Sequence, residues 1–111
     1  MPEQDPADDL LTFIHAAPTP WHAVEETVRR LEGAGFRPLD ERERWTVAPG
    51  DKVFVTRGGS SIAAFELGRA PPSEGGFRLV GAHTDSPNLR LKPHPQAATE
   101  GMQQLAVEPY G

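Results

Sequence analysis

The chain has 111 residues, which is enough for one small domain at most. Its hydrophobic share of 37% and charged share of 24% are typical of a soluble globular protein. The net charge of −5 argues against a nucleic-acid partner or an anionic membrane surface. The chain contains no cysteine, which excludes a disulfide framework and a thiolate metal site. Any metal ion would therefore need histidine and carboxylate ligands.

The first residues of the chain, 1–7, are rich in proline and acidic residues and poor in apolar ones, so we expect a disordered lead. They lack the basic segment and apolar run of a signal peptide. No apolar run approaches the length of a membrane span. We therefore expect a cytoplasmic protein whose folded part is residues 8–111.

Two helices are predicted after this lead. The first should be capped by Asp8 or Asp9, because acidic residues favour the positive end of a helix, and should run through Ala16. The second is the stronger prediction, with Thr19 as a good N-cap and Pro20 at the first helical position. Apolar residues spaced three, four and three apart form one continuous face along it: Trp21, Val24, Val28 and Leu31.

A β-rich part follows the helices. Residues 52–57 and 61–67 predict two strands joined by the Gly58-Gly59-Ser60 turn, which is a hairpin signal. Residues 77–82 predict a central strand covered on both faces, because apolar residues follow one another almost without interruption: Leu79, Val80 and Ala82. Together these elements predict the α/β class.

Another strand is expected over residues 89–92, where apolar and basic residues alternate. The Pro93-His94-Pro95 segment should end this strand, because proline cannot donate to a ladder. Residues 99–107 are expected to form a further short strand or an ordered loop.

Polar residues replace apolar ones abruptly after the predicted central strand. His83 and Asp85 fall there, and functional groups in open α/β sheets lie at the carboxyl ends of strands. A neutral imidazole is a common zinc ligand, and a carboxylate two residues further on can reach and orient it. The alternative is a histidine in an ordinary Asp-Ser-Pro turn. Spacing alone favours the turn, because a zinc site needs three or four ligands.

The residues around this pair carry a resemblance to a known family. The segment Gly81–Pro93, Gly-Ala-His-Thr-Asp-Ser-Pro-Asn-Leu-Arg-Leu-Lys-Pro, resembles the first metal-binding segment of the aspartyl aminopeptidases, which are co-catalytic zinc exopeptidases. Ala17–Val24 and Val107–Gly111 are similar to two other segments of that family. The resemblance covers nearly all of the chain from Leu10 onward, whereas family members continue for several hundred residues beyond the position of Gly111.

This resemblance implies the N-terminal part of an α/β/α sandwich of the zinc exopeptidase type. The chain would be an incomplete domain that ends near the start of the family's inserted β-rich domain. The resemblance also implies that His83 binds one of two zinc ions and that Asp85 orients the catalytic site. The other metal ligands and the carboxylate that acts as general base would lie beyond Gly111.

Family members release N-terminal aspartate or glutamate from peptides and assemble into large tetrahedral oligomers. The function expected from the resemblance is therefore that of a metallo-aminopeptidase acting on acidic N-termini, with this chain inactive alone. Two alternatives stay open: a non-catalytic assembly or binding module, and a related dinuclear hydrolase with another substrate. The resemblance gives no metal role to His22, which is expected to be a surface residue near a helix cap. His15 is expected at a helix end, and His94 is expected to be exposed.

Overall fold

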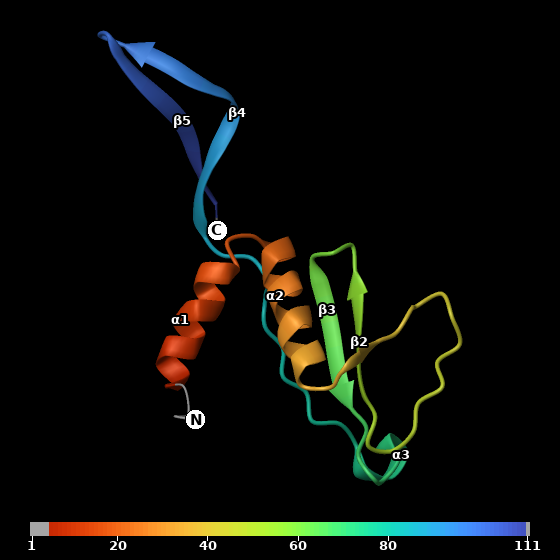
Figure 1. Cartoon of the computed structure of the whole chain (residues 1–111). Helices are drawn as coiled ribbons and strands as arrows, with labels where there is room; N and C mark the ends of the chain where they lie inside the picture. Colours follow the sequence, from red (N-terminus) through yellow and green to blue (C-terminus); the bar gives the residue numbers. More distant parts are fainter. Residues whose placement is uncertain (1–4, 111) are drawn as a thin grey trace.

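The structure is a computed structural model that describes residues 5–110 (Figure 1). Its elements in chain order are α1 (Pro6–Ala16), α2 (Pro20–Gly33), β1 (Arg37–Pro38), β2 (Lys52–Arg57), β3 (Ser61–Glu66), α3 (Pro72–Gly75), β4 (Asn88–Thr99) and β5 (Met102–Tyr110). The first three strands form one sheet in the order β1-β2-β3, and β4 and β5 form a separate hairpin. None of the helices found in residues 5–110 has the length and apolar character needed to cross a membrane.

Both predicted N-terminal helices are present. Helix α1 begins three or four residues earlier than expected, because Asp5 rather than Asp8 or Asp9 is its N-cap and accepts a hydrogen bond of 2.9 Å from the backbone N–H of Ala7. The expected disordered lead is therefore wrong for Pro6 and Ala7, while its residues 1–4 lie outside the described part of the chain. Helix α2 begins after the predicted cap, Thr19, and ends at Gly33.

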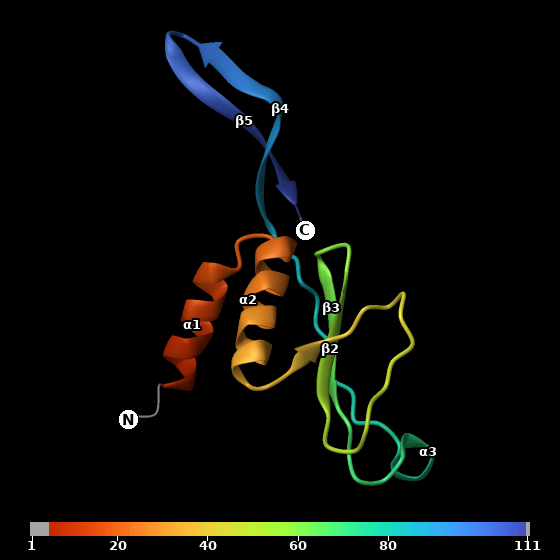
Figure 2. The ribbon, with the colours of Figure 1, turned by 45° about the vertical axis from the view of Figure 1, so that its right-hand side comes forward.

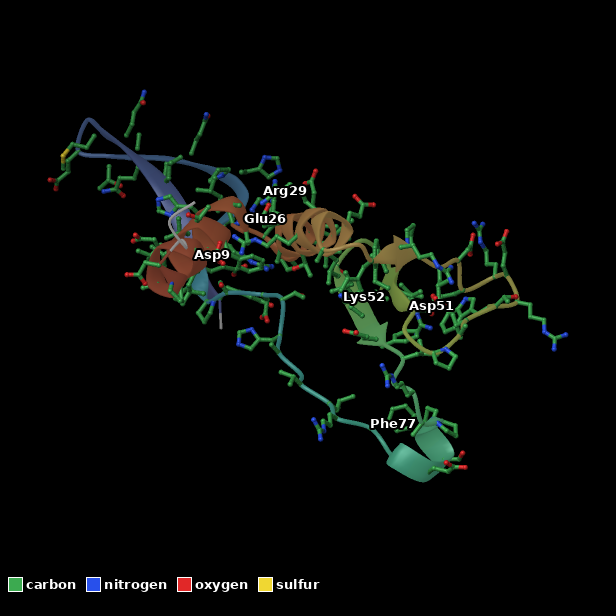
Figure 3. All side chains as sticks on the ribbon, turned by 60° about the horizontal axis from the view of Figure 1, so that its bottom comes forward. Asp9, Glu26, Arg29, Asp51, Lys52 and Phe77 are labelled. Carbon is green, nitrogen blue, oxygen red and sulfur yellow. The ribbon has the colours of Figure 1, made fainter. Side chains whose placement is uncertain are left out.

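A cluster of ion pairs that includes a buried carboxylate joins the two helices through Arg30. Glu26 on α2 is only 8% exposed and accepts hydrogen bonds from the guanidinium groups of Arg29 and Arg30. The bond from Arg29 is the main reason why the pKa of Glu26 is lowered to about 2. Arg30 also binds Asp9 on α1 at 2.8 Å, so one side chain bridges both helices. Figure 3 shows Asp9, Glu26 and Arg29 gathered around the two helices.

The predicted hairpin is confirmed. β2 and β3 pair antiparallel from Lys52↔Glu66 to Arg57↔Ser61, and Gly58 and Gly59 supply the left-handed turn with φ of 60° and 69°. Helix α2 lies beside β3 in both ribbon views (Figure 1 and Figure 2). The buried apolar residues of the described chain come from α2 and β2: Ala23, Val24, Val53 and Phe54.

The central strand predicted over residues 77–82 is not formed. No strand within residues 5–110 pairs with this segment, and a β-strand exists only through its ladder hydrogen bonds. Its apolar side chains are almost fully exposed, with Val80 at 99%. In Figure 2 the segment runs as an unpaired trace past β3. Phe77 lies next to α3, away from the two long helices (Figure 3).

The expectation that Pro93-His94-Pro95 ends a strand is also wrong. β4 continues through these residues to Thr99, and its pairing with β5 shifts register between Leu91 and Gln96. Proline is tolerated in a ladder at such an irregularity, because the residues there are not paired. The last predicted element is a strand, β5, which extends to Tyr110.

The chain is elongated and exposes more surface than a compact domain of its size. Its radius of gyration is 19.8 Å, whereas a compact domain of this length has a radius of about 13 Å. Its accessible surface is 9518 Å², whereas a compact monomer of this mass exposes about 6,000 Å². The β4–β5 hairpin projects away from the rest of the chain in both ribbon views (Figure 1 and Figure 2). These features are those of an incomplete α/β domain, as predicted.

Candidate metal-binding site

The predicted site residues lie in the irregular segment between α3 and β4. This segment is attached to the β2–β3 hairpin, because the Thr84 hydroxyl donates a hydrogen bond of 2.9 Å to the Ser60 carbonyl oxygen. Ser60 is the last residue of the Gly-Gly-Ser turn. The hairpin predicted from sequence therefore holds His83 and Asp85 in place, although the strand expected before them is not formed.

The structure brings His83 and Asp85 into direct contact. The Nδ1 atom of His83 lies 2.7 Å from the Asp85 carbonyl oxygen and 3.0 Å from Asp85 Oδ1. Both partner atoms are hydrogen-bond acceptors, so Nδ1 carries the proton and Nε2 carries the lone pair. The His83 side chain is 77% exposed. In the described part of the chain, no hydrogen bond reaches Nε2, so this nitrogen can accept a metal ion.

The second carboxylate oxygen of Asp85 has its own partner. The Tyr110 hydroxyl donates a hydrogen bond of 3.0 Å to Asp85 Oδ2. This bond, helped by the nearby His83, lowers the pKa of Asp85 below its ordinary value, although partial burial opposes the shift. Asp85 is therefore ionised at neutral pH and acts only as an acceptor toward the imidazole.

Tyr110 is a site residue that sequence reasoning missed. The similarity of Val107–Gly111 to a family segment drew attention to this stretch but gave Tyr110 no role. Its position depends on the β4–β5 register, which places Tyr110 opposite Asn88. The Arg90 guanidinium lies 3.6 Å from the centre of the Tyr110 ring, in a cation–π contact.

Two hollows border the site, and His83 and Asp85 line both of them. One has a volume of about 410 Å³ and is mostly apolar, with walls from α1, α2 and β3 that include Phe13, Ile14, Ala23 and Ile62. The other has a volume of about 480 Å³, with walls that include Trp21, Ser60, Arg90 and Tyr110. The site residues are therefore accessible from two sides.

The remaining histidines lie elsewhere, as expected. The Nδ1 atom of His22 is 2.7 Å from the Thr19 hydroxyl at the N-cap of α2. His15 is in the last turn of α1, and His94 is exposed in β4 with a φ of 55°. Within residues 5–110, no three histidine or carboxylate side chains are grouped to hold a metal ion. His83 and Asp85 thus fit the roles of one ligand and its orienting partner, and further ligands would have to come from outside the described residues.

An imidazole oriented by a carboxylate is a common arrangement at zinc sites, so the His83–Asp85 pair is compatible with the class of metal-dependent hydrolases. Comparison with known proteins identifies the family within this class. Residues 13–111 match the family model described as Aminopeptidase I zinc metalloprotease (M18), and the chain belongs to this family. The resemblance to zinc aminopeptidases inferred from sequence is confirmed.

The chain is similar to several members of this family. It is 56% identical over 102 residues to "Probable M18 family aminopeptidase 2" of Pseudomonas fluorescens (strain SBW25), an alignment that covers 92% of this chain and 24% of the relative. The Pseudomonas syringae pv. syringae (strain B728a) protein of the same name is 54% identical, with the same coverage. The chain thus spans about a quarter of the length of these curated relatives.

Solved structures show the same fold. A chain in the cryo-EM structure of the Ape4 and Nbr1 complex is 44% identical, with a TM-score of 0.80 over 95% of this chain and 20% of that chain. The S. cerevisiae mApe1 dodecamer is 33% identical, with a TM-score of 0.76 over 96% of this chain and 25% of that chain. The elongated shape described above therefore matches the corresponding part of larger aminopeptidases.

Proposed function

We propose that the chain is the N-terminal part of a zinc-dependent aminopeptidase. In this proposal His83 binds one of two zinc ions, and Asp85 orients the His83 imidazole. The observation that carries this proposal is the His83–Asp85 contact, which fixes the proton on Nδ1 and leaves the Nε2 lone pair for a metal ion. Membership of the M18 family supports zinc as that ion.

In this proposal each residue has a separate task. Zinc, when bound, supplies Lewis-acid polarisation of the scissile carbonyl and lowers the pKa of water. His83 holds the ion through Nε2. Asp85 fixes the tautomer of the imidazole and raises its basicity as a ligand, because its ionised carboxylate accepts a hydrogen bond from the Nδ1–H group. The remaining ligands and the general base would come from outside these 111 residues.

We propose peptides with an N-terminal aspartate or glutamate as substrates. The similarity of Gly81–Pro93 to the metal-binding segment of the aspartyl aminopeptidases supports this choice. In this proposal residues 8–111 belong to the catalytic domain, and the projecting β4–β5 hairpin lies near the start of an inserted β-rich domain.

Self-association is also proposed. The related mApe1 protein of S. cerevisiae is a dodecamer. Apolar side chains exposed on the β4–β5 hairpin provide a surface that self-association would cover: Leu89, Leu91, Met102 and Leu105. The same surface would also serve a non-catalytic assembly module. Zinc binding through His83 distinguishes the aminopeptidase from such a module, because only the aminopeptidase requires it.

The test uses an extended protein, in which the chain continues past Gly111 as its relatives do. His83→Ala should remove one zinc ion and most of the activity. Asp85→Ala should weaken zinc binding by about ten- to a hundred-fold and impair catalysis, because it removes only the orienting partner. His22→Ala is the matched control and should keep the full zinc content, since His22 is bound to the α2 cap. Unchanged zinc content in His83→Ala would refute the proposal.

A further inference from the structure

We propose that Tyr110 is a positioning residue for the His83–Asp85 pair and that Arg90 holds Tyr110 in this role. This inference rests on the proposed function. It adds β5, at the other end of the described chain, to the set of elements that build the site. Tyr110 and Asp85 are 25 residues apart in sequence, so their contact depends on the fold of the hairpin.

The geometry of the Asp85 carboxylate is the first argument. One oxygen lies 3.0 Å from His83 Nδ1, and the other accepts the Tyr110 hydroxyl at 3.0 Å. A carboxylate bound through both oxygens cannot rotate about its terminal torsion without breaking one of the two contacts. Asp85 is part of an irregular segment, so no regular element fixes this side chain. The hydroxyl of Tyr110 therefore sets the orientation in which Asp85 meets the imidazole.

The second argument is the way Tyr110 itself is held. Tyr110 pairs with Asn88 at the base of the β4–β5 hairpin, and Arg90 lies two residues further along β4. Side chains two residues apart on a strand share one face, which brings Arg90 diagonally over the ring. Its guanidinium carbon is 3.6 Å from the ring centre. A cation at this distance restricts the ring and with it the direction of the hydroxyl.

The site segment is thus held from two sides. Thr84 binds the turn of the β2–β3 hairpin through Ser60, and Asp85 binds the base of the β4–β5 hairpin through Tyr110. His83 lies next to both attachments. A displacement of the β4–β5 hairpin would therefore change the orientation of the imidazole and the affinity for zinc.

The decisive variant is Tyr110→Phe in the extended protein, because it deletes the hydroxyl and keeps the ring on which Arg90 stacks. Zinc affinity, measured by competition with a chromophoric chelator, should fall, but by less than the loss of about ten- to a hundred-fold expected for Asp85→Ala, because Asp85 itself remains. The kcat should fall while KM changes little, because Tyr110 acts on the metal ligand and not on the substrate. Arg90→Gln should give a smaller loss of zinc affinity.

Thr12→Val provides the matched control. It deletes a hydroxyl that also makes one hydrogen bond, of 2.8 Å to the Asp8 carbonyl oxygen, on the exposed surface of α1. Zinc affinity and kcat should stay at their original values in this variant. The free energy of unfolding of Tyr110→Phe and Thr12→Val, measured in the metal-free proteins, shows that both remain folded.

A double-mutant cycle separates positioning from a general structural role. If Tyr110 acts through Asp85, Tyr110→Phe should cause no further loss of zinc affinity in the Asp85→Ala background. A loss of equal size in both backgrounds would overturn the proposal, as would unchanged zinc affinity in Tyr110→Phe alone. If the unmodified extended protein bound no zinc through His83, the proposed function would fail first. If it bound zinc through His83 but Tyr110→Phe kept the original zinc affinity, only the inference about Tyr110 would fail.

Discussion

Two valines mark the extremes of exposure in this chain. Val53 on β2 has an exposure of 0%, whereas Val80 in the unpaired segment 77–82 has an exposure of 99%. Truncation of each to alanine removes the same two methyl groups. In Val53→Ala the lost burial amounts to about 0.8 kcal/mol per group, so with the added cavity the cost should be about 2 kcal/mol. If residues 77–82 stay as exposed as in this structure, the Val80 side chain contacts only solvent, and Val80→Ala should change the free energy of unfolding by no more than about 0.5 kcal/mol.

The two valine variants also test whether residues 77–82 are buried in the extended protein. The run of apolar residues in 77–82 predicts a central strand covered on both faces. If further strands and helices cover it, Val80→Ala should also cost about 2 kcal/mol, close to the cost of Val53→Ala. The assay is equilibrium unfolding in urea of the extended protein and both variants, compared at equal m-value.

The two variants test different features: Val80→Ala tests the burial of residues 77–82, and Val53→Ala tests the core position of β2. If Val80→Ala stays within about 0.5 kcal/mol while Val53→Ala costs about 2 kcal/mol, the segment remains uncovered and the central-strand prediction is wrong. If Val53→Ala is itself neutral, β2 does not form the core described here. Val53→Ala thus serves as the internal control for the measurement on Val80.

Two further predictions concern the stability of the chain. The isolated 111-residue polypeptide should associate in sedimentation velocity and unfold without a sharp transition, because its apolar surface and strand edges are left open. Reversible, monomeric, two-state unfolding would contradict this expectation. Glu26, whose pKa is lowered to about 2 by Arg29 and Arg30, should contribute stability above pH 4.5 that is lost as the pH falls toward 2. Glu26→Gln in the metal-free extended protein should flatten this part of the stability profile, and an unchanged profile would show that the Glu26 cluster is not formed.

Local signals were sufficient for the regular elements that depend on neighbouring residues. Thr19 and Pro20 start α2 as predicted, because capping is decided within one helical turn. The Gly58-Gly59 turn fixes the β2–β3 register, because a tight turn permits few pairings. The His83–Asp85 contact belongs to the same group, since its two members are separated by one residue.

Features that depend on distant residues could not be predicted from the sequence. The apolar pattern of residues 77–82 indicates a covered strand, but a pattern cannot supply the partner that a ladder needs. The continuation of β4 through Pro93 and Pro95 depends on a register shift against β5. Tyr110 reaches Asp85 only because the β4–β5 hairpin brings Tyr110 back to the start of β4, close to Asp85. The order of residues in the sequence does not show this contact.

The most direct test of the account is zinc content together with release of N-terminal aspartate from a peptide. Three samples are compared: the 111-residue chain, the extended protein and its His83→Ala variant. The account predicts full turnover in the extended protein, little in His83→Ala and none in the 111-residue chain, because the His83–Asp85 pair alone leaves zinc short of protein ligands. Chelator-sensitive turnover by the 111-residue chain, or full activity of His83→Ala, would contradict it.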